Sequence, residues 1–249
     1  MTVSEIIRPG DKVDISFFQK HERLEAGEEL PKIYKSQVLD LKENGNIEVS
    51  MPSEAGRLVL LPLSIRLELV FFSRGGLYRA VGQIVERYKS DNVYMLEIEF
   101  KSQLEKYQRR EFFRYPCVLD VNYYMISEEE YKYGSGDAIF IQIREDKERC
   151  KDEHLGRIVD LSGGGVRFYT EHEIKKEQYV LFELFLENES FNKRYYIVSK
   201  IISCIRSDKM PEMRYEARAK FLISDNNVRE EIIRFIFEEE RKTRQRGRW

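Results

Sequence analysis

Three arginines within ten positions, in the sequence YQRREFFRYP at residues 107–116, are the first residues that suggest a chemistry. Arg109, Arg110 and Arg114 alternate with aromatic residues and are followed by Pro116. An arginine side chain stays charged, presents its donors on one plane, binds phosphate in bidentate fashion and stacks on flat rings. Because Pro116 favours an extended residue before it, we expect a strand to start there, with the arginines at the mouth of a barrel. A solvated patch paired with nearby glutamates is the ordinary alternative for such a cluster.

A second stretch, GRIVDLSGGGVRF at residues 156–168, interrupts a strand pattern with an aspartate, a serine and three glycines. Taken alone, it indicates a tight turn between two strands. Asp160 can also accept hydrogen bonds from the N1 and N2 donors of a guanine edge, which an arginine cannot do, and Ser162 adds a hydroxyl group. Gly165 would allow a close approach of the backbone or a positive φ.

Together, the two stretches predict one site for a guanine nucleotide. The O6 and N7 atoms of guanine accept hydrogen bonds from arginine, whereas N1 and N2 donate to aspartate, and the remaining arginines would bind phosphates. A good bidentate contact between arginine and guanine contributes about 1 to 3 kcal/mol of discrimination. The expected ligand-binding residues are Arg109, Arg110, Arg114, Asp160, Ser162 and Gly165.

Enzyme chemistry is not indicated by these residues. A hydrolase nucleophile requires Gly-x-Ser-x-Gly, but Asp160 stands two positions before Ser162. The glycines at 163–165 lead directly into VRFYT, which is a strand pattern and not the helix that follows a phosphate-binding loop. The three histidines have no metal-ligand spacing, and acidic residues are too common here to select a catalytic pair. We therefore expect a protein that is not an enzyme, with no catalytic residue, no metal site and no cofactor.

Short alternating or apolar runs separated by turn residues predict a mainly β protein, made of two small β-barrels joined by a short linker. Residues 1–104 are expected to form the first barrel domain, with turns at ENGN, SRGG and KSDN, where Gly, Asn and Asp tolerate positive φ. Its strands are expected at residues 11–18, 33–41, 46–51, 65–72, 77–88 and 92–100.

Residues 105–249 are expected to form the second domain, which begins with the arginine-bearing linker. Polar segments near 127–136 and 145–154 are expected to be surface loops. A C-terminal α-helix is predicted, with Asn227 as its N-cap and Glu230, three residues later, as the reciprocal residue of a capping box. The last nine residues carry five cations and are expected to fray. The strands are expected at 116–125, 138–144, 156–161, 164–170, 178–187, 194–206 and 214–223, and the apolar face of the helix consists of Val228, Ile232, Phe235 and Ile236.

The composition agrees with two ordinary domains. The chain has 249 residues, of which 42% are hydrophobic and 35% are charged, so it carries enough apolar residues to fold. A formal net charge of −2 argues against a general nucleic-acid binder, whose domains usually show a basic excess. The longest apolar stretch, LVLLPLSI at 58–65, is far shorter than the roughly 20 residues that span a bilayer. The polar start of the chain does not match a signal peptide, and the three cysteines lack a CxxC spacing, so we expect a cytoplasmic protein with reduced thiols.

The pattern Arg110-x-x-x-Arg114, followed later by Asp160-x-Ser162-x-x-Gly165, resembles the two-part signature of PilZ domains, receptors for the bacterial second messenger cyclic di-GMP (c-di-GMP). In that family the first motif lies in a flexible segment before the barrel, and the second lies on an early strand and its turn. The resemblance implies that the second domain is a PilZ β-barrel and that c-di-GMP is the ligand.

The N-terminal part, with RPGDKVDI, MPSEAGRLVLLP and YKSDNVYMLEIEF, resembles the companion domain of YcgR-like flagellar brake proteins. This resemblance implies a split barrel, a change in the relative orientation of the two domains on ligand binding, and a role in motility. The implied partners are flagellar motor, stator or switch proteins at the basal body. One departure is that a glycine commonly precedes a late V-x-F strand in PilZ domains, whereas RYEARAKF has Ala217 and Ala219. This departure concerns the barrel edge and not the ligand.

Two alternatives remain open. A barrel that binds single-stranded RNA would stack bases on the aromatic residues of the first stretch and hold phosphates with the basic C-terminal tail. The aromatic residues in question are Tyr107, Phe112, Phe113 and Tyr115. A PilZ regulator of exopolysaccharide synthesis would bind the same second messenger and act on a different partner.

Overall fold

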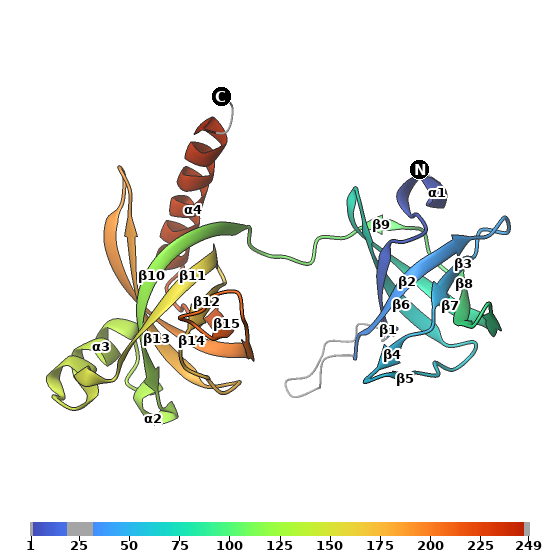
Figure 1. Ribbon diagram of the computed structural model, residues 1–249. Helices are drawn as coiled ribbons and strands as arrows, with labels where there is room; N and C mark the ends of the chain where they lie inside the picture. The colour runs from blue at the N-terminus through green and yellow to red at the C-terminus, as the bar shows by residue number, and fades with distance from the viewer. Residues whose placement is uncertain (1, 19–31, 247–249) are drawn as a thin grey trace. The chain divides into compact units, whose positions relative to one another are not determined.

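The computed structural model describes residues 2–18 and 32–246. The protein is mainly β and divides into two compact units, Met1–Arg109 and Arg110–Trp249, each of which contains one barrel (Figure 1). This division falls inside the segment that the sequence analysis assigned to the linker. The domain limits at residues 104 and 105 stay a prediction.

The N-terminal unit is a six-stranded antiparallel barrel. Its strands are β1 (Lys12–Phe17), β2 (Tyr34–Leu41), β3 (Ile47–Ser50), β6 (Arg66–Ser73), β7 (Gly76–Ser90) and β8 (Val93–Phe100). They pair in the order β6-β1-β2-β3-β8-β7, and β6 also pairs with β7, which closes the ring. Alternate side chains point into the core, as Val13 and Ile15 of β1 do. All six strands predicted for this part of the sequence are confirmed.

The sequence pattern does not predict four short elements of this unit. They are α1 (Val3–Ile6), the hairpin of β4 (Ser53–Glu54) and β5 (Arg57–Leu58), and β9 (Glu105–Lys106), which pairs with the edge of β7. Each is too short to show a period in its sequence, so only the folded neighbours specify it.

The C-terminal unit is a second closed antiparallel barrel of six strands. They are β10 (Arg114–Ile126), β11 (Glu153–Ser162), β12 (Gly165–Thr170), β13 (Tyr179–Glu187), β14 (Asn192–Arg206) and β15 (Tyr215–Phe221). They pair in the order β10-β11-β12-β15-β14-β13, and β10 closes on β13. Tyr123, Phe168 and Phe182 form an aromatic centre of the core, with rings 5.1 to 6.0 Å apart. Six of the seven strands predicted here are confirmed.

The seventh predicted strand, at residues 138–144, is wrong, because this segment lies in the helix α3 (Gly136–Glu145). The run AIFIQI alternates like a strand, but the side chain of Ser135 accepts a hydrogen bond from the N–H of Ala138 (3.3 Å) and starts a helix. Ile139 and Ile143, four residues apart, are then buried together in a second apolar cluster on the barrel.

The polar segments on either side of α3 are not only loops. The segment before it contains α2 (Glu128–Tyr131), which Ser127 caps in a capping box, and the segment after it contains the 3-10 helix η1 (Arg149–Lys151). Arg149 joins the two segments, because its Nη2 atom donates to Glu130 Oε1 (2.7 Å) and to the carbonyl oxygen of Met125 (2.9 Å). The whole insertion between β10 and β11 is therefore ordered against the barrel.

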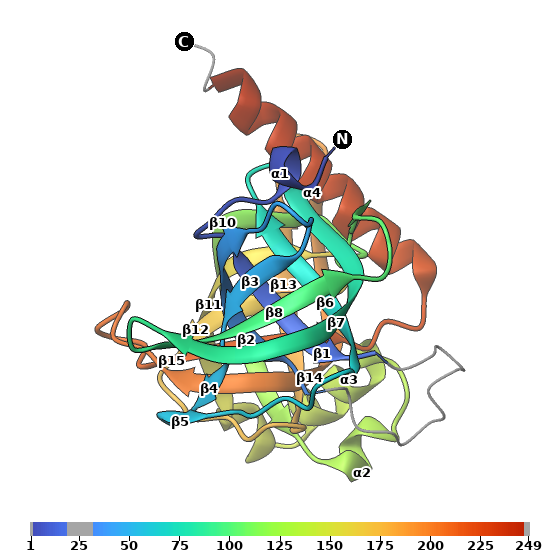
Figure 2. The ribbon, with the colours of Figure 1, turned by 90° about the vertical axis from the view of Figure 1, so that its right-hand side faces the viewer.

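The C-terminal helix α4 (Asn226–Arg246) packs on the opposite end of the barrel from α3 in both ribbon views (Figures 1 and 2). Its predicted apolar face is confirmed: Ile232, Phe235 and Ile236 are buried in the barrel core and Val228 packs against them. The predicted cap is wrong by two residues, because Asp225 Oδ1 accepts from the N–H of Asn227 (2.9 Å), which is already helical. Fraying of the tail is also wrong as far as residue 246, where the helix ends; residues 247–249 lie outside the described residues.

His154 of β11 provides a prediction about pH. Its ring lies 5.2 Å from Tyr123 and 4.5 Å from His172, centre to centre. Burial, and then the charge of His172, lowers the pKa of His154 below the ordinary 6.5. The unfolded chain therefore binds the proton first, and the contribution of a neutral His154 to stability is present above about pH 6.5 and is lost as the pH falls toward the lower folded-state pKa.

We expect His154→Gln to make the unfolding free energy less dependent on pH between about 5.5 and 7.5, measured by urea denaturation in a pH series. Wild-type protein measured in parallel is the reference. An unchanged pH slope in the variant would contradict the assignment.

Candidate ligand site

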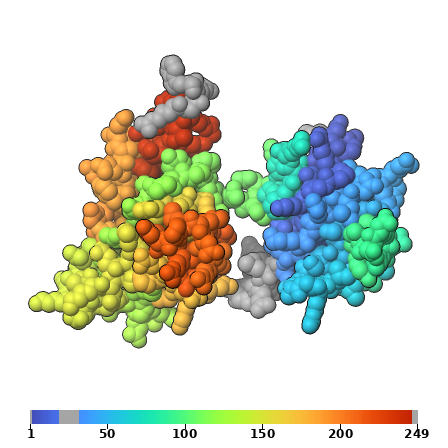
Figure 3. Space-filling model, viewed as in Figure 1, coloured from blue at the N-terminus to red at the C-terminus, as the bar shows by residue number. Residues whose placement is uncertain are grey.

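Strand pairing brings the two predicted motifs together. Arg114 is the first residue of β10 and pairs with Ser162, the last residue of β11, and Pro116 pairs with Asp160. The third arginine of the first stretch therefore lies beside the aspartate and the serine of the second. Arg114 is exposed, and β10 forms part of the surface of its unit together with the turn between β14 and β15 (Figure 3).

Ser162 and Gly165 hold the backbone of the turn that joins β11 to β12. The two residues pair across the turn, and Ser162 Oγ donates a hydrogen bond to the carbonyl oxygen of Gly165 (3.0 Å). Ser162 is only 7% exposed. A Cβ atom on Gly165 would overlap with the carbonyl oxygen of Ala219 in β15. The sequence suggests either a close approach of the backbone or a positive φ at Gly165, and the close approach to β15 is the main reason for the glycine.

Asp160 takes part in a charged row across three strands. It pairs in register with Arg167 of β12, and Arg167 pairs with Arg218 of β15. Arg167 Nη2 lies 3.7 Å from Asp160 Oδ2, and Arg167 Nη1 lies 3.5 Å from Glu216 Oε2. The side chain of Asp160 keeps 20% of its exposed area. Arg167 thus adds a further cation to the face that carries the aspartate.

Glu216 of β15 forms ion pairs with two arginines of this row, Arg167 and Arg218. Burial raises the pKa of Glu216, but the hydrogen bond from the Tyr169 hydroxyl (3.0 Å) and the charges of Arg167 and Arg218 outweigh burial and lower the pKa. The carboxylate is therefore charged and holds Arg167 in place. Arg167 is not among the predicted site residues; its position two residues after Gly165, on the same face of the strand, is the signal that could have found it.

The other two predicted arginines lie before β10. Arg110 is exposed and stands four residues before Arg114, within the same unit as the second motif. Arg109 belongs to the N-terminal unit, where its Nη1 atom lies 3.7 Å from Asp14 Oδ2 and its guanidinium carbon lies 5.1 Å from the ring centre of Phe72. The structure therefore groups Arg114 with Asp160, Ser162 and Gly165, and it gives Arg109 contacts in the other unit.

The aromatic residues of the first stretch have partners within their own units. Tyr107 lies under Arg79 (5.1 Å), Phe112 lies under Arg229 (5.4 Å), and Phe113 stacks on Phe237 of α4 (6.3 Å). Tyr115 packs against the barrel core. These contacts occupy ring faces that an RNA-binding surface would present to bases.

Other chemistries find no support in the part of the chain that the structure describes. No group of three or more His, Cys, Asp or Glu residues in this part is placed to hold a metal ion. The three cysteines are free thiols. Within the same residues, none of the helices has the length and apolar character to cross a bilayer.

Comparison with known proteins shows the family of the chain. The family model for the PilZ domain matches residues 108–238, more than half of the chain, and the protein belongs to this family. Residues 8–100 match the model described as PilZNR, flagellar protein YcgR. The chain therefore combines a YcgR-type N-terminal domain with a C-terminal PilZ domain. Proteins of this family are c-di-GMP receptors and not enzymes.

Solved structures with this arrangement are also similar. The inhibitor of motility MotI/DgrA from Bacillus subtilis is 16% identical, with a TM-score of 0.68 over 96% of this chain and 100% of that one, which shows a shared fold. YcgR from Escherichia coli in complex with c-di-GMP is 12% identical, with a TM-score of 0.45 over 96% and 87% of the two chains. The MrkH and c-di-GMP complex from K. pneumonia is 14% identical, with a TM-score of 0.40 over 96% and 90%. None of the curated proteins matches the chain.

Proposed function

We propose that this protein binds c-di-GMP on the outer face of the PilZ barrel, at the place where β10 and β12 begin and β11 ends. The observation that supports the proposal is the pairing of Arg114 with Ser162, which brings one arginine of the first motif next to the second motif. Arg110 and Arg114 bind the phosphates and the O6 and N7 edge of a guanine, and Asp160 accepts from N1 and N2. Ser162 and Gly165 keep the turn in the shape that this arrangement needs.

The charge around Asp160 suits this role. An N–O distance of 3.7 Å to Arg167 is an ion pair and too long for a hydrogen bond, so the carboxylate retains acceptor capacity for a base. Arg167 still orients the aspartate through their opposite charges. Arg109 joins the ligand in this proposal by leaving Asp14, an exchange of one long ion pair (3.7 Å) for charge-assisted contacts with phosphate.

The proposed output is a change in the relative orientation of the two domains. The ligand neutralises the clustered arginines and orders the segment that joins the domains, and this restricts how the domains move. The N-terminal match to flagellar protein YcgR supports flagellar motility as the regulated process, with a motor, stator or switch protein at the basal body as the partner. Regulation of exopolysaccharide synthesis is the competing output.

Isothermal titration calorimetry tests the proposal, with c-di-GMP, GTP, cyclic di-AMP and a short single-stranded RNA as separate titrants. We expect heat with c-di-GMP alone, and loss of that heat in Asp160→Ala. Asp120→Ala is the matched control, because Asp120 is an exposed aspartate of the neighbouring strand β10, paired with Arg157 (2.8 Å) and placed beyond the bulge from the site. Equal binding of RNA by all three proteins would contradict the proposal and support the RNA-binding alternative.

A further inference from the structure

The turn between β11 and β12 packs against an aromatic ring. It consists of Gly163 and Gly164, and the ring of Phe112 lies close to both of them. A Cβ atom on Gly164 would come within 2.8 Å of Phe112 Cδ2 and 3.1 Å of Phe112 Cε2, and a Cβ atom on Gly163 would come within 2.9 Å of Phe112 Cδ1. The ring therefore rests on the second motif, although Phe112 belongs to the first.

The backbone of this turn does not itself require glycine. Neither Gly163 nor Gly164 adopts the positive φ that favours glycine, in contrast to Gly45 or Gly56 in the N-terminal barrel. The three atoms nearest to a Cβ on Gly164 all belong to Phe112. The space taken by the ring is thus the reason why side chains are absent at this position.

Helix α4 also contacts the ring. The guanidinium carbon of Arg229 lies 5.4 Å from the ring centre of Phe112, a cation–π distance. The same guanidinium donates to the carbonyl oxygen of Gly163 (3.2 Å) and to that of Ile223 (3.1 Å). One side chain thus joins the ring, the turn and the start of the helix.

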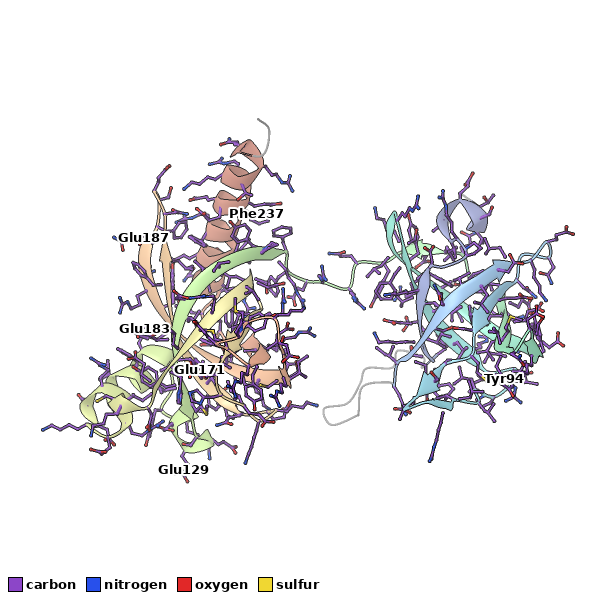
Figure 4. The ribbon with its side chains drawn as sticks, in the orientation of Figure 1. Tyr94, Glu129, Glu171, Glu183, Glu187 and Phe237 are labelled. Carbon is purple, nitrogen blue, oxygen red and sulfur yellow. The ribbon has the colours of Figure 1, made fainter. Side chains whose placement is uncertain are left out.

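A second ring of the same stretch also contacts α4. Phe113 stacks on Phe237, which Figure 4 labels on α4, at 6.3 Å with an interplanar angle of 16°. These two rings are 45% and 54% exposed, so they bury less area than Phe112 does. The docking of Phe112 is therefore the tighter of the two attachments.

We propose that Phe112 and Arg229 are positioning residues for the ligand site: Phe112, which contacts both the Gly163 and Gly164 turn and Arg229, fixes the segment that carries Arg110 and Arg114. The inference rests on the proposed function. Phe112 lies between the two arginines in sequence, so docking its ring restricts the backbone on both sides before the ligand arrives. A segment that is already restricted at Phe112 loses less conformational freedom when the ligand orders the rest of it, and this raises affinity without any contact between Phe112 and the ligand.

A double-mutant cycle between Gly164 and Phe112 tests this role. The variants are Gly164→Ala, Phe112→Ala and the double variant, each titrated with c-di-GMP in the full-length protein. We expect each single substitution to weaken binding about tenfold. The double variant is expected to bind as the Phe112→Ala variant does, because the new methyl group then meets no ring. Additive losses, or unchanged affinity in the single variants, would overturn the proposal.

Hydrogen-exchange mass spectrometry of the ligand-free proteins measures the order of the arginine-bearing segment without the ligand. Exchange at residues 109–114 is expected to be faster in both single variants, with an unchanged midpoint of global unfolding. Phe185→Ala is the matched control, because Phe185 is a half-exposed ring of β13 that lies under an arginine (5.5 Å) away from this turn. If wild-type protein does not bind c-di-GMP, the proposed function fails and exchange alone decides: unchanged rates at residues 109–114 would still overturn the docking role.

Discussion

Replacing Arg114 by alanine is expected to weaken the binding of c-di-GMP by about a hundredfold or more. A hydrogen bond to a charged group contributes about 1.5 to 3 kcal/mol, and a bidentate arginine makes two such bonds, so the expected loss is at least about 3 kcal/mol, slightly more than the roughly 2.7 kcal/mol of a hundredfold change. Arg114 is exposed and lies at the first position of β10. The fold is therefore expected to tolerate its removal, and the loss belongs to the ligand.

Two further variants make the Arg114 result specific. Arg114→Lys keeps the charge but not the planar fork, and we expect it to recover only part of the affinity. Arg157→Ala removes an exposed arginine of the neighbouring strand that pairs with Asp120, and it is expected to bind like wild type. Calorimetric dissociation constants and urea midpoints are measured for all three. An alanine variant with wild-type affinity would refute the placement of the ligand on this face.

Gly165→Ala is expected to lower the unfolding free energy of the PilZ barrel by about 2 to 4 kcal/mol. The new Cβ atom would overlap with the Ala219 carbonyl oxygen and would lie 3.2 Å from Lys220 Cα. Both obstacles are backbone atoms of β15, so β12 and β15 must separate for the methyl group to fit. Chemical denaturation of the full-length protein measures the loss, and reduced ligand binding is expected to accompany it.

The neighbouring glycine is the control for this prediction. A Cβ atom on Gly164 meets only the ring of Phe112, which can move, so Gly164→Ala is expected to change the unfolding free energy by less than about 0.5 kcal/mol. Loss of binding in Gly165→Ala at wild-type stability would mean that Gly165 acts through the ligand and not through the barrel.

The strands were predictable because one face of each is buried. Val13 and Ile15, or Ile158 and Leu161, mark the core side in the sequence itself, and turn residues separate the runs. Residues 138–144 mislead for a definite reason: Ile139, Ile141 and Ile143 alternate as in a strand, but Ile141 is exposed and the other two face the barrel as one side of a helix. The capping serine before them was the better signal.

The site was predictable where residue type alone indicates chemistry. The arginines and the aspartate carry that information, and the proximity of Arg114 to Asp160 follows from the pairing of β10 with β11. Arg167 and Arg229 were not predicted, because their roles depend on partners far away in sequence: Glu216 for the first, and Phe112 with the glycine turn for the second. The contacts of Arg229 leave no local pattern, whereas the position of Arg167 on the same strand face as Gly165 is a local signal.

The irregularity in β10 has a consequence for motion. Its ladder with β11 shifts register between Pro116 and Leu119, so the pairs of Arg114, Tyr115 and Pro116 form a short run of their own. The hydrogen bonds between these three residues and β11 can break without those beyond the bulge, so the longer ladder from Leu119 to Tyr124 stays intact. The first three residues of β10 can therefore separate from β11 at a small cost in free energy, while the rest of the barrel keeps its shape.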